Sequence, residues 1–175
     1  MTALANDCKI VRYGSGDGAQ PEAYPIGNAQ KIYSGDVALV SGSGATTVGY
    51  LKATGTVGAS DIVVGMVGDA TGGDYSTSPG LPTPAADGGV WAGVLTGAFF
   101  FQSGTGGDTL SAATNGQTVY YGGSNQNGPI ACATNGSGAN PVLGVQVPQD
   151  PGIAGGVNPG ANYFPVIVAP LKGRP

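Results

Sequence analysis

Short runs of apolar residues, separated by glycine, proline and polar turn residues, recur along the whole chain. Each run is rich in β-branched or aromatic side chains, which favour strands. No longer window keeps a helical period without an interrupting Gly or Pro, so helices are not expected. The pattern predicts strands at residues 9–13, 31–33, 36–40, 49–54, 61–68, 89–95, 98–102, 118–121, 129–133, 141–147 and 163–169.

Many short strands at close spacing are typical of an all-β sandwich or barrel. We therefore expect an all-β fold with a single β-barrel or β-sandwich domain of the jelly-roll or β-tulip kind. Residues 1–30 are expected to form an extended N-terminal arm, followed by the barrel or sandwich domain at residues 31–175. A stretch without strand pattern predicts a long surface loop at about 68–89.

Phe99, Phe100 and Phe101 stand side by side in a chain that has only 4 Phe. Because side chains alternate along a strand, Phe99 and Phe101 share one face and Phe100 takes the other. Bulk on both faces predicts a central strand that is buried on both sides. Two interpretations of Phe100 stay open: packing within the barrel, or packing under an arm or a neighbouring subunit.

The strand pattern of residues 35–67 is echoed at residues 116–147. Gly49, Asp61 and Gly65 match Gly128, Asn140 and Gly144 at one constant spacing. The echo predicts two related three-strand units, which we expect as facing sheets of one barrel. Convergence in a glycine-rich β protein is the alternative.

Charge is scarce in this chain. Charged residues make up 9% of it, against roughly 25% in an average globular protein, and this favours a surface covered by partners in a large assembly. The 6 basic residues are scattered and the net charge is -4, whereas binding to a nucleic-acid backbone needs clustered Lys and Arg. No apolar window is long enough for a membrane span, and no secretory signal is visible. We therefore expect no direct contact with nucleic acid or membrane.

Catalytic signals are missing as well. Without histidine the chain lacks the usual general base and the Ser-His and Cys-His dyads. Cys8 and Cys132 allow one disulfide at most but are expected to be reduced, and with no histidine they form no metal site. Gly14–Ala19 fits a dinucleotide-binding pattern but is followed by extended chain, and Ser103–Leu110 resembles one imperfect copy of a tandem calcium-binding repeat. The sequence predicts a protein that is not an enzyme and takes no cofactor.

Several segments follow one another in the order found in a known family. They are Tyr24-Pro25, Ile32–Val37, Gly49–Leu51, Val63–Val67, Leu110–Ala113, Gly116–Tyr120 and Gly144–Val147. In these segments the chain resembles the capsid decoration, or cement, proteins of tailed bacteriophages. The resemblance covers residues 24–147, most of the chain.

The resemblance implies a β-barrel or β-sandwich head with an N-terminal arm, bound to the outside of the expanded capsid, commonly as a trimer. The partner is then the major capsid protein, stabilised against internal DNA pressure, in a virion assembled in the host bacterial cytoplasm. A phage fibre, tail or receptor-binding β module is the alternative, and a hydrolase or metal-dependent binder is a weaker third. Aromatic side chains suit interfaces, and the candidate assembly contacts are Tyr13, Tyr24, Pro25, Tyr33, Phe100, Tyr163 and Phe164.

Overall fold

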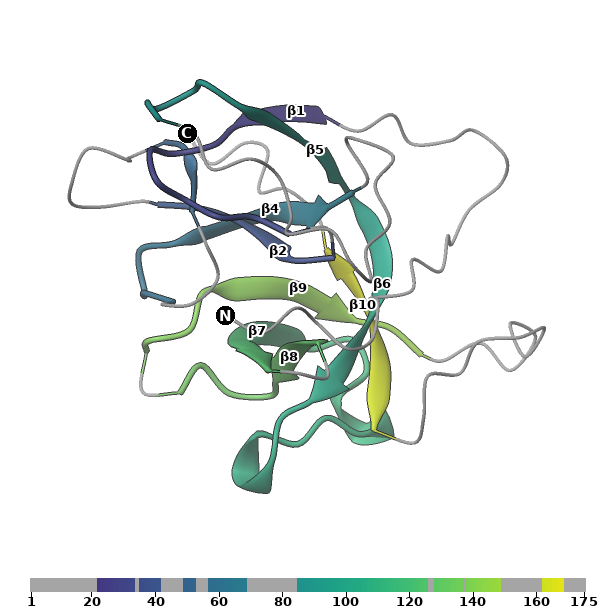
Figure 1. Ribbon diagram of the computed structural model, residues 1–175. Coiled ribbons are helices and arrows are strands. Elements are labelled where there is room, and N and C mark those ends of the chain that lie inside the picture. Colours follow the sequence, from purple (N-terminus) through teal and green to yellow (C-terminus); the bar gives the residue numbers. More distant parts are fainter. Residues whose placement is uncertain are drawn as a thin grey trace, which may run out of the picture.

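The computed structural model describes residues 22–33, 35–41, 49–52, 57–68, 85–125, 128–136, 138–148 and 162–168. In these residues the fold is all-β and includes a β-barrel, as the sequence predicts (Figure 1). The strands are β1 (Glu22–Pro25), β2 (Val37–Val40), β3 (Leu51–Lys52), β4 (Ile62–Val67), β5 (Trp91–Leu95), β6 (Gly97–Ser103), β7 (Thr118–Asn125), β8 (Gly128–Cys132), β9 (Val142–Gln146) and β10 (Tyr163–Val168). Two single-turn 3-10 helices, η1 (Gly106–Asp108) and η2 (Ala112–Thr114), lie between β6 and β7.

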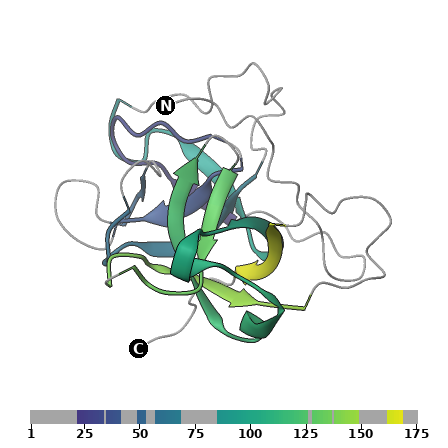
Figure 2. The ribbon, with the colours of Figure 1, turned by 90° about the horizontal axis from the view of Figure 1, so that it is seen from below.

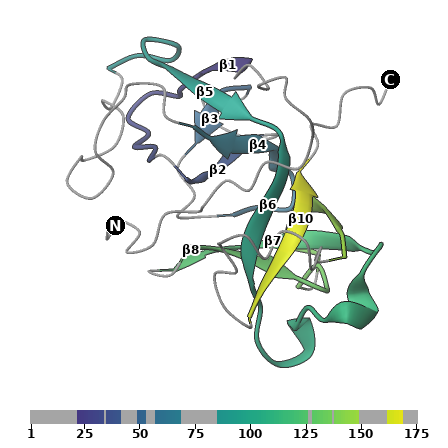
Figure 3. The same ribbon diagram turned by 90° about the vertical axis from the view of Figure 1, so that its right-hand side faces the viewer.

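The strands form two assemblies, one from each half of the chain. The first five form a sheet in the order β1-β5-β4-β2-β3, which we call the N-terminal sheet. The last five close into a barrel in the order β10-β6-β8-β7-β9, which we call the C-terminal barrel. The sheet lies above the barrel in Figure 1, and Figure 2 views the molecule from the barrel end. Only Thr96 separates β5 from β6, so the chain passes directly from one assembly to the other (Figure 3).

The two assemblies repeat one arrangement of five strands. In each, the first strand pairs with the fifth, the second with the third and fourth, and the fourth with the fifth, all antiparallel. The first and third strands run parallel in both halves. Ser103 pairs with Ala131 in the barrel, whereas a single bridge from Ile26 to Leu51 brings the corresponding strands together in the sheet. The N-terminal sheet therefore has the strand arrangement of the barrel, but its first and third strands are joined by only one bridge.

The residue-by-residue register is also the same in both halves. Met66 pairs with Leu95 in the sheet, and at the equivalent place Val145 pairs with Ile167 in the barrel. Between the second and fourth strands, both ladders shift by one residue at a β-bulge at the same point. Agreement of topology, register and bulge makes the second half a structural repeat of the first.

A glycine stands at each bulge for the same steric reason. A Cβ on Gly65 would overlap the carbonyl oxygen of Leu95, and a Cβ on Gly144 would overlap the carbonyl oxygen of Ile167. Leu95 and Ile167 are equivalent residues, since they pair with Met66 and Val145. The fourth strand thus lies too close to the fifth for any side chain at this position.

The predicted internal repeat is confirmed for these residues, but its extent and arrangement differ from the prediction. The unit has five strands instead of three, and the two units are not facing sheets of one barrel. The reason is that each half supplies its own first and fifth strands. The first and fifth strands of each half lie outside residues 35–67 and 116–147, so the glycine matches between those two ranges do not reveal them.

Two local predictions differ from the structure. Residues 31–33 form no strand, because a turn closed by the backbone hydrogen bond from the Asp36 N–H to the Tyr33 carbonyl, at 3.2 Å, lies there; the Asp36 carboxylate also accepts from the Tyr33 N–H at 2.9 Å. Glu22–Pro25, expected within the arm, is strand β1 and pairs with β5. The remainder of the expected arm, residues 1–21, and residues 69–84 of the expected loop lie outside the described residues.

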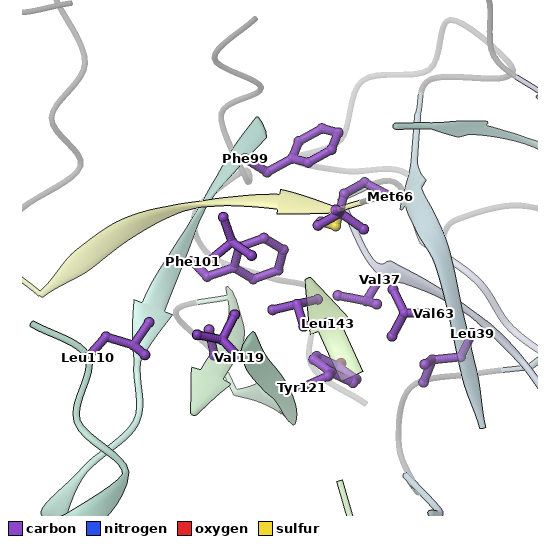
Figure 4. Packing of buried hydrophobic residues seen from close by; sticks show 13 residues of the cluster. Val37, Leu39, Val63, Met66, Phe99, Phe101, Leu110, Val119, Tyr121 and Leu143 are labelled. Carbon is purple, nitrogen blue, oxygen red and sulfur yellow. The ribbon is translucent and has the colours of Figure 1, made fainter. Parts of the chain in front are cut away.

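Two clusters of buried side chains form the core. The smaller cluster lies within the N-terminal sheet and consists of Ile26, Ile32, Ala38, Leu51, Val67, Ala92 and Val94. The larger cluster fills the barrel and includes Phe99 and Phe101, which confirms that these two share a core-facing side of β6 (Figure 4). It also takes in side chains of β2 and β4, namely Val37, Leu39, Val63 and Met66. The barrel therefore packs against the outer side of the N-terminal sheet.

Candidate assembly surfaces

Trp91 is the most exposed large hydrophobic side chain of the described residues, at 56%. It begins β5 and pairs with Pro25 of β1, so both side chains lie on the same side of the sheet. A Cβ on Gly88 would lie 3.4 Å from the Tyr50 ring and 3.9 Å from the Cβ of Pro25, so these two residues flank Gly88. We call Pro25, Tyr50 and Trp91 the Trp91 surface.

Hydrogen bonds hold the chain that leads into Trp91. The backbone N–H of Ile26 donates to the carbonyl of Val90 at 2.9 Å, and the N–H of Gly88 donates to the carbonyl of Ile26 at 2.9 Å. The Asp87 carboxylate accepts from the N–H of Asn28 at 2.5 Å. These hydrogen bonds attach the turn before Trp91 to the residues that follow β1. The backbone that carries the exposed indole is therefore held in place. An aromatic side chain held in this way is a good anchor for a protein partner.

Three exposed aliphatic side chains lie together on the C-terminal barrel. Val145, 42% exposed, pairs with Ile167, 43% exposed, and Val142 of the same strand is 40% exposed. Val145 and Val142 pair with Thr118 and Tyr120, two alternate residues of β7, so both valines lie on one side of the barrel wall. We call Val142, Val145 and Ile167 the barrel face. Clustered exposed apolar residues are a common feature of protein–protein contact sites.

The predicted contacts near the N-terminus fall in different surroundings. Pro25 belongs to the Trp91 surface. Tyr24 lies on the other side of β1, packs against the core of the N-terminal sheet, and donates from its hydroxyl to Glu22 at 3.4 Å. Tyr33 is half-buried, with the ammonium group of Lys31 5.5 Å from its ring centroid. Tyr13 lies outside the described residues.

The predicted contacts on the barrel are partly or fully buried within this one chain. Phe100 is 5% exposed, so little of its side chain is left for a second chain to cover. Phe164 is half-buried and packs against the barrel core. Tyr163 is half-buried at the start of β10, the place equivalent to that of Trp91 at the start of β5. The role of these residues in assembly stays a prediction.

Asp36 is the most unusual ionisable group of the described residues. It is buried at 4% exposure, and burial raises the pKa of its carboxyl from 3.8 to about 6, although the hydrogen bond from the Tyr33 N–H lowers it. Gln117 stands at the equivalent turn of the barrel, where its N–H donates to the carbonyl of Thr114 as the N–H of Asp36 donates to that of Tyr33. The carboxylate is therefore not required to form this turn.

Two other buried polar side chains, Asp61 and Gln146, have hydrogen-bond partners that serve the fold. The carboxylate of Asp61 accepts from the Lys52 ammonium group and from the Gly58 N–H, each at 2.7 Å. The amide of Gln146, fully buried in β9, accepts from the Thr114 hydroxyl at 2.6 Å and donates to Ser111 and Asn115. The hydrogen bonds of Gln146 hold the segment around η2 against the barrel. Neither set leaves a reactive group facing solvent.

Within the described ranges, no group of three or more His, Cys, Asp or Glu side chains is placed to hold a metal ion. Burial and the nearby Asp108 carboxylate raise the pKa of the Cys132 thiol, so this cysteine is kept protonated. In the same part of the chain, no helix is both long and apolar enough to span a membrane. The prominent features of the described surface are therefore the two apolar surfaces.

Comparison with protein-family models, curated proteins and solved structures gave no significant match.

Proposed function

We propose that this chain is a structural protein of a virion, and within that class a capsid decoration protein. It binds the outside of the expanded capsid of a tailed bacteriophage and stabilises the capsid against the pressure of packaged DNA. The major capsid protein is its partner. The ordered segments between Tyr24 and Val147 and the scarcity of charge support this proposal.

The structural observation that carries the proposal is the Trp91 surface. Trp91 is exposed on a backbone fixed by hydrogen bonds, and it lies beside Pro25 of the Tyr-Pro segment that the resemblance includes. Aromatic residues supply much of the binding energy at protein interfaces. We assign this surface to the contact with the capsid. Binding here needs no catalytic group and no metal.

The test is binding of the purified protein to expanded capsids that lack it, measured by co-sedimentation. We expect saturable binding to expanded capsids, and about a thirtyfold rise in Kd for Trp91→Ala, equivalent to about 2 kcal/mol. Ile62→Ala is the matched control because Ile62 is also exposed, at 44%, but lies on β4 away from the Trp91 surface. Equal binding by both variants would reject the assignment of the surface. Binding to tails or host cells alone would favour the fibre or receptor-binding alternative.

A further inference from the structure

The structural repeat allows the two halves to be compared surface by surface. The outer side of β2, β4 and β5 in the N-terminal sheet carries five apolar residues, Val37, Leu39, Val63, Met66 and Leu95. The first four are at most 3% exposed, and Leu95 is half-buried. All five pack in or against the larger core cluster.

The barrel is what covers this outer side. Strand β4 lies against β9 and β10 of the barrel, and the larger cluster joins Met66 and Val63 to Phe99 and Val168. Figure 4 shows side chains of β2 and β4 and of the barrel strands directed into one common core. The chain thus already contains an interface in which one five-stranded unit covers the β2-β4-β5 wall of another.

The register identifies the same wall on the barrel. The residues equivalent to Val63, Met66 and Leu95 are Val142, Val145 and Ile167, which are the barrel face. These positions are apolar in both halves, but in the barrel they are 40%, 42% and 43% exposed. The remaining two positions are Thr118, which is exposed, and Tyr120, which is half-buried. Neither half has a charged residue at any of these positions.

We propose that the barrel face is a self-association surface, covered by a five-stranded unit of a second copy of this chain. The partner follows from the repeat, because the equivalent wall of the first half is covered by a unit of this same chain. The absence of charge agrees with this choice, since a basic, acidic or nucleic-acid partner would call for complementary charges. Apolar burial would then drive the association. The inference goes beyond the proposed function and needs no capsid.

The experiment measures the mass of the purified full-length protein by light scattering across the micromolar range, without capsids. We expect a discrete oligomer for the unchanged protein: a dimer if the face pairs with itself, or a closed ring if it meets a different part of the second copy. Val145→Lys and Ile167→Lys, made separately, place a charge in the face from two strands. Each should raise the dissociation constant of the oligomer at least about tenfold.

Ile62→Lys is the matched control, because Ile62 is an aliphatic strand residue of similar exposure, 44%, outside the face. Its oligomer should keep the mass of the unchanged protein. Thermal melting at low concentration checks that each variant is folded, and either face variant suffices if the other does not fold. A monomeric unchanged protein, or an oligomer whose dissociation constant is unchanged in the folded face variants, would overturn the proposal. Capsid binding is measured in a separate assay, so the self-association proposal and the capsid-binding proposal can be rejected independently.

Discussion

Replacing the buried carboxylate of Asp36 by a neutral amide is expected to stabilise the protein near neutral pH. Above its raised pKa, Asp36 is an ion held at 4% exposure with one backbone N–H as a hydrogen-bond donor. Asp36→Asn keeps the size of the side chain and an oxygen that can accept from Tyr33. Gln117 shows that the equivalent turn of the barrel forms with a neutral side chain.

The size of the effect follows from the pKa. The pKa of Asp36 rises from 3.8 to about 6 on folding, and this difference corresponds to about 3 kcal/mol. Because the folded protein binds the proton more tightly than the unfolded chain, the contribution of this group to stability is fully present below pH 3.8. It is lost as the pH rises through about 6. At pH 7, Asp36→Asn should therefore be more stable than the unchanged protein by up to about 3 kcal/mol.

Urea denaturation at a series of pH values, followed by tryptophan fluorescence and circular dichroism, measures this difference. The two proteins should have similar free energies of unfolding near pH 4 and should diverge as the pH rises to about 6. The comparison near pH 4 is an internal control, because Asp36 is then largely protonated in the folded protein. A constant difference at all pH values, or a less stable variant at pH 7, would refute the argument.

Two further predictions use the same denaturation assay. Gly144→Ala should lower the free energy of unfolding by about 1–3 kcal/mol, because the new Cβ overlaps the carbonyl oxygen of Ile167 and β10 must move. The control is Gly107→Ala, whose Cβ would meet nothing within 4 Å, and an equal loss in both would contradict the steric reason. Gln146→Leu should cost about 1–3 kcal/mol, because it removes the hydrogen bonds that the fully buried Gln146 amide makes with Thr114, Ser111 and Asn115. A stability equal to that of the unchanged protein would show that these bonds contribute nothing.

The strands from β2 onward were predictable from local pattern, because their apolar runs are bounded by turn residues. The glycine echo was predictable too, since Gly65 and Gly144 are both required by the approach of a neighbouring strand. The shared core-facing side of Phe99 and Phe101 was predictable from the alternation of side chains along a strand. These features depend on neighbours in sequence or on one residue type.

The rest depends on contacts between distant residues. Strand β1 escaped prediction because Glu22–Pro25 has no β-branched residue and contains proline, and its pairing with β5 comes from residues 91–94. The Trp91 surface was not predicted, because Trp91 lies in an apolar run that has the pattern of an ordinary strand. Its exposure could have been suspected from the small core-facing residues at alternate positions, Ala92 and Val94, which place Trp91 on the opposite side.

The barrel face could not be recognised from sequence alone. Val142 and Val145 belong to an apolar run that looks the same as the buried run containing Val63 and Met66. Only the packing of the two halves shows that one run is covered and the other exposed. The difference in exposure arises from tertiary packing, which the spacing of apolar residues along the sequence does not reveal.

The most direct measurement of the proposed function is a cryo-electron microscopy map of expanded capsids that lack this protein, before and after incubation with it. We expect added, saturable density on the outer capsid surface, with the Trp91 surface turned toward the major capsid protein. The same incubation with Trp91→Ala should leave the density weak. Absence of added density in every capsid state, with folded protein present in excess, would rule out the proposed function.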